Sequence, residues 1–205
     1  MPDISILNTK SANFHSVKKA LDLFNQQNII TSDINEINNS KGLIIPGVSS
    51  TDTVLQNIKE LKLEKIIVDF YMSGKPILCI CVGMQILFEN SEEGVKPGLG
   101  IIKGSVKKIP KLENNFKVPH MGWNQLELIK ESKIFHGIST NTNFYFVHSY
   151  FCDPIEEEIV TGRTNYSIQM CAAIEKDNLS AVQFHPEKSG EDGLKIYENF
   201  NKMIN

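Results

Sequence analysis

The chain has 205 residues, of which 41% are hydrophobic and 22% charged, and its formal net charge is −3. This length and composition suit a single globular domain spanning residues 1–205, and the mild acidity argues against nucleic acid or an anionic membrane as the main partner. No run approaches the roughly 18 apolar residues that span a bilayer, and the start lacks a signal peptide's basic and apolar regions. We therefore expect a cytoplasmic protein with free thiols.

The first half alternates short apolar runs with amphipathic stretches, a pattern that predicts buried strands joined by helices. Strands are predicted at 4–7, 42–46 and 76–80. The helix after the first strand carries an apolar face made of Val17, Ala20, Leu21 and Phe24. A second helical stretch runs to about residue 72, and a third helix opens near Gly83. The pattern indicates a largely parallel central sheet.

The second half reads mostly as strands, several of which we expect to be antiparallel. They are predicted at 105–110, 124–129, 143–150, 157–163, 167–176 and 179–187. A last helix covers 189–204, where Ser189 and Asp192 are spaced like a capping box. The fold class is therefore α/β, a three-layer sandwich around a central mixed, mostly parallel sheet.

Two cysteines end the third predicted strand, in the run "ILCICVGMQILFEN" (77–90). Cys79 and Cys81 lie about 6–7 Å apart along an extended segment, which is too far for a comfortable disulfide. No second cysteine or histidine pair completes a zinc site, so we expect no metal and no cofactor. The remaining roles are nucleophile and core residue.

Cys81 is the better candidate for a nucleophile. It lies where a parallel strand gives way, through Gly83, to a helix, and such a corner holds a side chain exposed and strained. The N–H groups at the start of that helix favour a thiolate. Cys79 lies inside the strand among apolar neighbours, so we assign it to packing. Taken alone, a cysteine near a strand end is usually inert.

A base for that cysteine is suggested by "AVQFHPEK" (181–188). His185 and Glu187 are two residues apart in a restricted, extended segment, which puts both side chains on one face. A carboxylate beside an imidazole fixes its tautomer and stabilises the imidazolium. Without the cysteine, the same motif would read as an ordinary surface turn. The other histidines have no carboxylate at this spacing: His15, His120, His136 and His148.

Nucleophilic acyl transfer also requires donors for the oxyanion. The segment "IIPGVSST" (44–51) closes a buried strand, and Gly47 lets backbone N–H groups turn toward a cleft. The N–H of Val82, directly after the nucleophile, is the second candidate donor.

Together these motifs resemble the class I, triad-type glutamine amidotransferases, which have a flavodoxin-like fold. "CVGMQ", "PGV" and "FHPE" carry the likeness to the superfamily. Further runs resemble one member, the glutaminase subunit of imidazole glycerol phosphate synthase. These runs extend the likeness over the whole chain: "ANFHSVKKAL", "GVKPGLGII", "VPHMGWNQL", "FYFVHSY" and "QFHPEKSGEDGLKIYENF".

The resemblance implies roles for individual residues. Cys81 is the nucleophile, His185 the general base and acid, and Glu187 its orienting carboxylate. The backbone of Gly47, Val48 and Val82 forms the oxyanion hole. The substrate's amino and carboxylate groups are held by Gln85, His148, Ser149 and Tyr150. Alternatively, Gln85 is a solvated helix residue, and Ser149 and Tyr150 only close a strand.

Two positions depart from the family pattern. Cys79 stands where the elbow usually has glycine, and Ser49 where the oxyanion segment has its last glycine. A side chain at residue 79 must fit a tightly packed turn. A Cβ at residue 49 resists positive φ, so it would hinder a peptide flip that assembles the hole.

The resemblance further implies the substrate L-glutamine and a partner, the (β/α)₈-barrel cyclase subunit, in a heterodimer. The partner would receive ammonia through an internal passage and form imidazole glycerol phosphate and an aminoimidazole carboxamide ribotide. Trp123 is our candidate docking anchor, since tryptophan is enriched at interface hot spots; the alternative is a core tryptophan.

Three other functions remain open at this point. The chain could feed ammonia to a different amidotransferase, or be a hydrolase or peptidase of similar architecture. It could also be a regulatory subunit weakened at Cys79 and Ser49. "PHMGWN" and the placement of "FHPE" before the last helix favour the synthase subunit.

Overall fold

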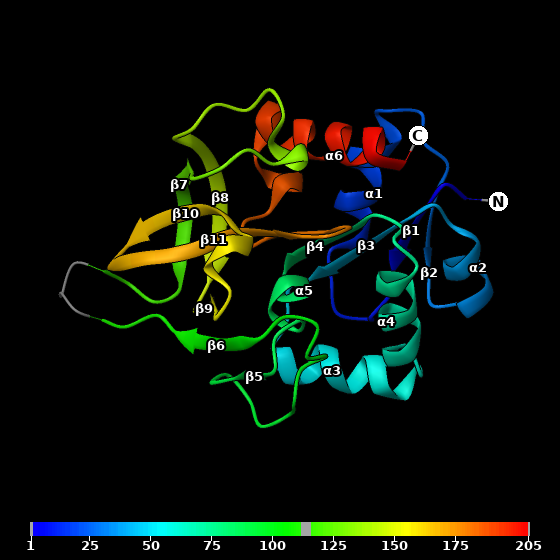
Figure 1. Ribbon diagram of the computed structural model, residues 1–205, viewed down its shortest axis with the longest axis horizontal. Coiled ribbons are helices and arrows are strands. Elements are labelled where there is room, and N and C mark those ends of the chain that lie inside the picture. Colours follow the sequence, from blue (N-terminus) through cyan, green and yellow to red (C-terminus); the bar gives the residue numbers. More distant parts are fainter. Residues whose placement is uncertain (1, 112–115, 205) are drawn as a thin grey trace.

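A computed structural model describes residues 2–111 and 116–204, and one mixed sheet runs through this part of the chain (Figure 1). The strands follow the spatial order β2-β1-β3-β4-β12-β11-β10-β7-β8. Their bounds are β1 Ile4–Leu7, β2 Asn28–Thr31, β3 Gly42–Gly47, β4 Ile77–Cys81, β7 His120–Leu128, β8 Thr142–His148, β10 Val160–Tyr166, β11 Ile168–Lys176 and β12 Leu179–Val182. Off this path lie β5 Asn90–Ser91, β6 Gly104–Lys108 and β9 Tyr150–Pro154.

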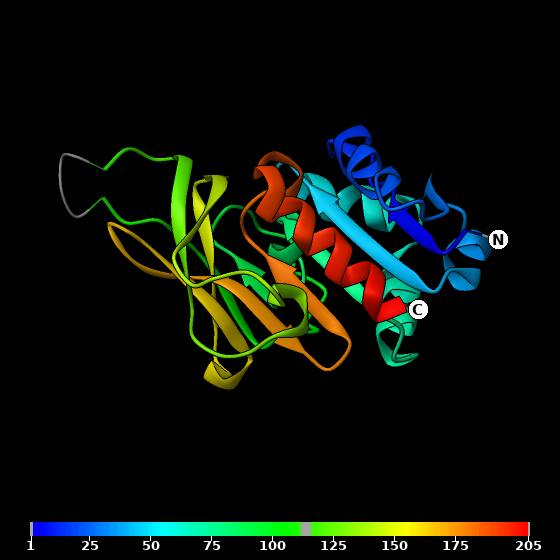
Figure 2. The same cartoon turned by 90° about the horizontal axis from the view of Figure 1, so that it is seen from above.

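The half of the sheet formed by β2, β1, β3, β4 and β12 is parallel. Strands β3 and β4 are buried along their whole length, as parallel strands covered on both faces must be. Helices α1 (Phe14–Asp22) and α6 (Gly190–Ile204) lie side by side over one face (Figure 2). Helices α3 (Thr51–Glu60) and α4 (Glu64–Met72) cover the other face.

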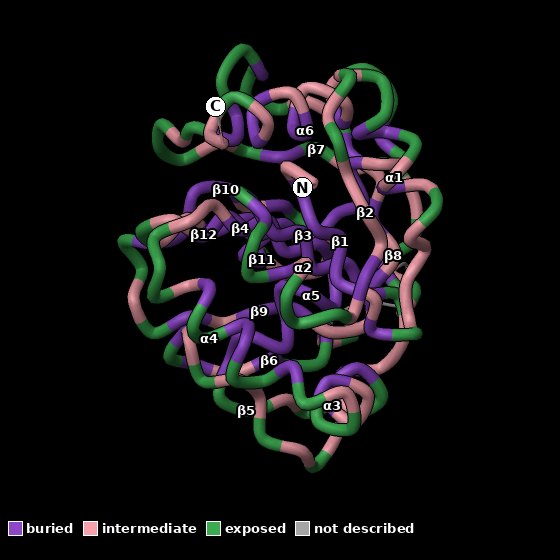
Figure 3. The backbone as a smooth tube through the Cα atoms, turned by 90° about the vertical axis from the view of Figure 1, so that its right-hand side faces the viewer, coloured by how far each residue is buried: buried purple, intermediate pink, exposed green. Residues whose placement is uncertain are grey.

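The other half is antiparallel, and it begins where β11 pairs with β12. Strands β10, β7 and β8 extend the sheet, while β9 pairs with β11 and β6 to form a side branch. Buried residues concentrate on the central strands and exposed residues on the surrounding loops (Figure 3). Among the described residues, no helix has the length and apolar character needed to cross a bilayer.

The predicted α/β fold class with a mixed central sheet is confirmed, and most predicted strands are present within a few residues of their expected bounds. Three details differ. The helical stretch before residue 72 is two helices, α3 and α4, and β2, α2 (Ile34–Asn39), β5 and β9 were not predicted. The helix after Cys81 is a single turn, α5 (Val82–Gln85).

The predicted capping box at the start of α6 does not form. The Ser189 hydroxyl instead donates to the carbonyl of His185 (2.7 Å) and accepts the N–H of Tyr145 (2.9 Å). The N–H of His185 in turn donates to the Tyr145 carbonyl (2.9 Å). Ser189 therefore ties the turn after β12 to strand β8, a tertiary role that local spacing does not reveal.

Candidate functional site

Cys81 ends β4 on a strained corner of the backbone. Its φ is +55° and its ψ −112°, a conformation that a non-glycine residue adopts only when its surroundings impose it. Gly83 makes the corner possible, since a Cβ there would lie 1.9 Å from the Ile45 carbonyl oxygen. The predicted strand-turn-helix corner is confirmed, but Cys81 is buried, only 3% exposed, rather than exposed as predicted. The single-turn helix also contributes a smaller dipole than a long helix would.

The predicted oxyanion segment lies at the end of β3, beside β4, with Gly47 paired in register with Cys81. The N–H of Val48, however, donates to the Ser11 carbonyl (3.1 Å). In this conformation Val48 is therefore not an oxyanion donor, and it can become one only if its peptide rotates. Val82 begins α5, where an N–H has no preceding helical acceptor, so its predicted role is compatible with the backbone.

His185 and Glu187 are brought together as predicted. The Nδ1 atom of His185 lies 2.8 Å from Oε1 of Glu187, and both side chains are at most 2% exposed. Because a carboxylate only accepts, Nδ1 carries the proton and Nε2 is left for other chemistry. Nε2 is buried without a standard hydrogen-bond partner in the described part of the chain.

The environment of His185 favours its charged form. Burial alone lowers the pKa of this imidazole, but the neighbouring Cys81 sulfur and the hydrogen-bonded Glu187 carboxylate together outweigh it. The net effect raises the pKa above the usual value of a histidine. The three predicted triad residues therefore form one electrostatic unit.

A buried glutamine that sequence reasoning missed also contacts the nucleophile. The Nε2 of Gln183 donates to Sγ of Cys81 (3.6 Å), and its Oε1 accepts a hydrogen bond from Nε2 of Gln85 (3.0 Å). Gln85 Nε2 also donates to the Tyr150 carbonyl (3.0 Å), which uses both of its hydrogens. The Oε1 of Gln85 therefore remains as an acceptor. Gln183 precedes His185 by two residues, so alternation along the strand was the available signal.

His148 belongs to an internal chain of hydrogen bonds. Its Nδ1 donates to the Tyr150 carbonyl (2.8 Å), so its Nε2 accepts from Nδ1 of His120 (2.9 Å). His120 Nε2 then accepts from the side-chain amide of Asn124 (3.3 Å). Both ring nitrogens of His148 are occupied, which leaves its ring no atom for a substrate. The carbonyls of Ser149 and Tyr150 already accept hydrogen bonds, so the predicted binding role falls to their backbone N–H groups.

This arrangement requires both rings of the histidine pair, His120 and His148, to be neutral. Burial lowers the pKa of His120 to about 4. Burial, the chief cause, together with the neighbouring charges of His120 and His185 lowers the pKa of His148 to about 3, against an opposing hydrogen bond to Tyr150. A second proton on either ring would set two N–H groups against each other.

A cavity of about 340 Å³ opens over the nucleophile, within the size range of small-molecule sites. Its lining unites the ends of β3, β4, β8 and β12: Val48, Ser49, Ser50, Cys81, Val82, Gln85, Glu93, Pro119, Val147, His148, Ser149, Tyr150 and His185. Glu93 was not predicted, because it comes from the loop 91–100. Its Oε2 accepts the N–H of Thr51 (2.7 Å), which fixes the carboxylate at this wall.

A larger open groove of about 1520 Å³ lies elsewhere, along 128–140 and α6, and contains none of the predicted site residues. The described residues hold no cluster of three or more histidine, cysteine or acidic side chains suited to a metal. Cys79 is fully buried, and burial raises the pKa of its thiol, which supports its assignment to packing. The cysteines are free thiols.

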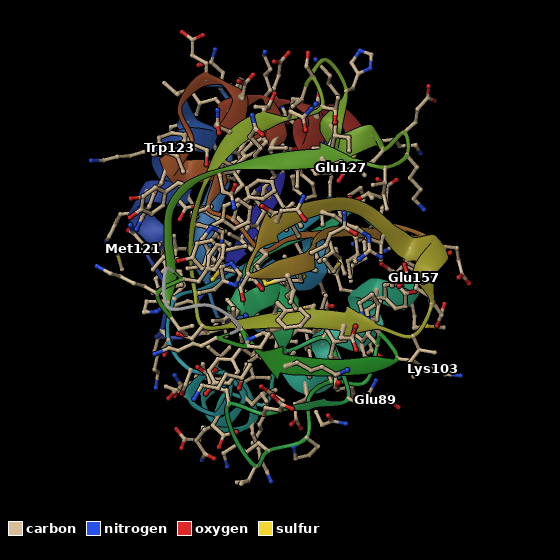
Figure 4. All side chains as sticks on the ribbon, turned by 90° about the vertical axis from the view of Figure 1, so that its left-hand side faces the viewer. Glu89, Lys103, Met121, Trp123, Glu127 and Glu157 are labelled. Carbon is tan, nitrogen blue, oxygen red and sulfur yellow. The ribbon has the colours of Figure 1, made fainter. Side chains whose placement is uncertain are left out.

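Trp123 is not a core residue. It is 58% exposed on β7, two residues after Met121, which is 62% exposed (Figure 4). Its ring packs edge-on against Tyr145, with 6.1 Å between ring centroids. β7 begins one residue after Pro119, which lines the cavity, so this apolar edge adjoins the site.

Comparison with known proteins identifies the family. The model of the family described as glutamine amidotransferase class-I matches residues 6–203. The chain belongs to this family. Within class I, the chain is 42% identical to the imidazole glycerol phosphate synthase subunit HisH of Moorella thermoacetica, over 100% of this chain and 96% of the relative. It is 44% identical to HisH of Methanocaldococcus jannaschii, over 98% of this chain and 100% of that relative. The amidotransferase therefore groups with the HisH subunits over its full length.

Solved structures agree on the fold of this amidotransferase. PurLQS from Thermotoga maritima superposes with a TM-score of 0.74 at 19% identity, covering all of both chains. The glutaminase domain of Trypanosoma brucei CTPS with bound acivicin superposes with a TM-score of 0.68 at 17% identity, covering 98% of this chain and 94% of that chain. At these identities the likeness concerns the fold alone.

Proposed function

We propose that this amidotransferase is the glutaminase subunit of imidazole glycerol phosphate synthase, and that it hydrolyses L-glutamine to glutamate and ammonia at Cys81. The observation that carries the proposal is His185, which is hydrogen-bonded to Glu187 and lines the same cavity as Cys81 at the strained end of β4. Full-length identity to HisH subunits supports the choice of reaction.

The catalytic cycle follows from these positions. The Cys81 thiolate attacks the carboxamide carbon, and His185 gives its proton to the departing nitrogen, leaving ammonia and a γ-glutamyl thioester. His185 then removes a proton from water, whose oxygen attacks the thioester and releases glutamate and the thiolate. The Val82 N–H stabilises the oxyanion. A second donor arises when the Val48 peptide turns away from Ser11.

The cavity provides complementary groups for an amino acid. The free Oε1 of Gln85 and the carboxylate of Glu93 suit the substrate's ammonium group. The backbone at Ser149 and Tyr150 is assigned to its carboxylate. The neutral His148 ring lies behind Tyr150 and holds that carbonyl in place, so it acts as support rather than as a ligand.

Ammonia must reach an acceptor before water protonates it, which calls for a partner. The relatives are named as subunits of imidazole glycerol phosphate synthase, so we assign the partner as the barrel cyclase subunit in a heterodimer. Its product would be imidazole glycerol phosphate together with an aminoimidazole carboxamide ribotide. We place the docking surface at Met121 and Trp123, the exposed apolar edge beside the cavity.

Alkylation with a chloroketone analogue of glutamine tests the choice of sulfur. We expect one label per chain at Cys81, and protection by added glutamine. The variant Cys81→Ser should lose labelling and glutamine-dependent synthesis by the complex while keeping ammonia-dependent synthesis. Cys79→Ala is the matched control and should retain labelling. Label at Cys79, or labelling that glutamine does not slow, would refute the assignment.

A further inference from the structure

Tyr197 carries a polar atom into the core beside the triad. It is the largest fully buried side chain among the described residues, on the face of α6 that also buries Ile196 and Phe200. That helix packs on the turn Pro186–Lys188, which contains Glu187. The apolar neighbours show that a phenyl ring would satisfy the packing here. The hydroxyl therefore needs a separate explanation.

The carboxylate of Glu187 has a matching need. Its Oε1 accepts the proton of His185 Nδ1, but its Oε2 is buried and lacks a partner at standard hydrogen-bond geometry among the described residues. The Tyr197 hydroxyl is in the same condition. A carboxylate oxygen only accepts and a phenol donates, so each group has what the other lacks.

The two groups belong to elements that pack together, α6 and the turn Pro186–Lys188. Burial is the main cause that raises the pKa of Tyr197 well above its ordinary value, and the charge of the nearby Glu187 carboxylate raises it further. The phenol therefore stays protonated and able to donate throughout the working pH range.

We infer that Tyr197 is a positioning residue of the proposed glutaminase: its hydroxyl donates to Oε2 of Glu187 and holds Oε1 against the imidazole of His185. The inference rests on the proposed roles of Cys81, His185 and Glu187. It extends the triad into a relay of four side chains, whose last member comes from the final helix. Tyr197 touches no reacting atom, so its effect passes through Glu187.

The variant Tyr197→Phe removes one oxygen and keeps the ring. We expect kcat for glutamine hydrolysis by the complex to fall about tenfold, because a hydrogen bond to a charged group is lost, with KM changed less than twofold. The control is Tyr71→Phe, which removes a phenol that donates to the carboxylate of Asp177 (2.7 Å) outside the site. It should leave kcat unchanged. Thermal unfolding of both variants verifies that they fold.

A second readout does not depend on glutaminase activity. Iodoacetamide alkylates the Cys81 thiolate, so its rate against pH follows the thiolate-imidazolium pair. Without the Tyr197 hydroxyl, Glu187 is held less firmly against His185, and we expect the midpoint to rise by about half a pH unit or more in Tyr197→Phe only. A shifted midpoint in a protein that does not hydrolyse glutamine would keep the inference and refute the proposed function.

Two results would overturn the inference itself. One is a Tyr197→Phe protein that matches Tyr71→Phe in both kcat and alkylation midpoint. The other comes from a double-mutant cycle, in which Tyr197→Phe should have almost no further effect in a Glu187→Gln background. An equal loss in both backgrounds would mean that Tyr197 acts elsewhere.

Discussion

The parallel and antiparallel halves of the sheet each supply one wall of the cavity, but they hold their residues in place by different means. On the parallel side, Gly83 lies so close to the Ile45 carbonyl that a Cβ would lie 1.9 Å from its oxygen. On the antiparallel side, a Cβ on Gly122 meets nothing within 4 Å, and the histidine pair is held by hydrogen bonds of fixed direction. The wall from the parallel half should therefore be sensitive to added side-chain volume. The wall from the antiparallel half should be sensitive to protonation of the histidine pair.

The largest effect on stability is expected at the parallel wall. In Gly83→Ala the new methyl group must displace backbone, so we expect a loss of about 3 kcal/mol or more in the free energy of unfolding. Glutaminase activity should fall at least about a hundredfold, because the elbow moves. Urea unfolding and steady-state kinetics measure both.

Gly122→Ala is the matched control for that change. Its φ is +130°, so alanine there costs backbone strain, about 1–2 kcal/mol, but no steric overlap. If both glycine variants lose the same free energy, close packing does not distinguish the two walls.

A smaller effect, visible only in acid, is expected at the histidine pair. In the folded chain the pKa is about 4 for His120 and about 3 for His148, below the unfolded value near 6.5. At a pH between the folded and unfolded values, the unfolded chain therefore binds more protons than the folded chain. Stability from this pair is fully present above pH 6.5 and is lost as the pH falls toward 4. For His148 the loss is on the order of 3 kcal/mol.

Unfolding of the wild type and of His148→Asn by urea at several pH values between 4 and 7 tests this dependence. The variant should be less stable at pH 7 but have a flatter pH dependence, whereas His15→Asn, at an exposed position, should keep the wild-type slope. His185 does not obscure the result below about pH 5.5, because its folded pKa is raised and both the folded and the unfolded chain then bind its proton. An unchanged slope in His148→Asn would argue against the neutral pair.

The smallest effect on stability is expected for Trp123→Ala, because this ring is mostly exposed. We expect the free energy of unfolding to change by less than about 1 kcal/mol. Affinity for the cyclase subunit should nevertheless fall about tenfold or more. Titration calorimetry measures it, with Met72→Ala, 75% exposed on α4, as the control that leaves binding intact. Equal affinity in both variants would remove Trp123 from the docking surface.

The same contrast explains what the sequence could predict. Strands β3 and β4 are continuous apolar runs, and the corner at Cys81 and the pair His185 and Glu187 depend on local spacing, so all were predictable. The short strand β2 and the break between β8 and β9 leave little signal in a single chain.

What was missed depends on contacts between distant segments. His120 lies opposite His148 only because β7 and β8 pair in that register. Glu93 reaches the cavity from a loop. The Ser189 hydroxyl accepts a hydrogen bond from the Tyr145 N–H of β8 instead of capping its own helix. Tyr197 fits the apolar spacing of α6, and nothing local distinguishes it from a core phenylalanine. The role inferred for its hydroxyl depends on the proximity of Glu187, which lies outside the local pattern of α6, in the preceding turn.

The backbone at residue 81 has an evolutionary consequence. Its left-handed φ costs of the order of 1–3 kcal/mol for a residue with a side chain, whereas glycine would adopt it freely. Selection for a robust fold alone would favour glycine at residue 81, so the reactive sulfur is held there at a cost in stability.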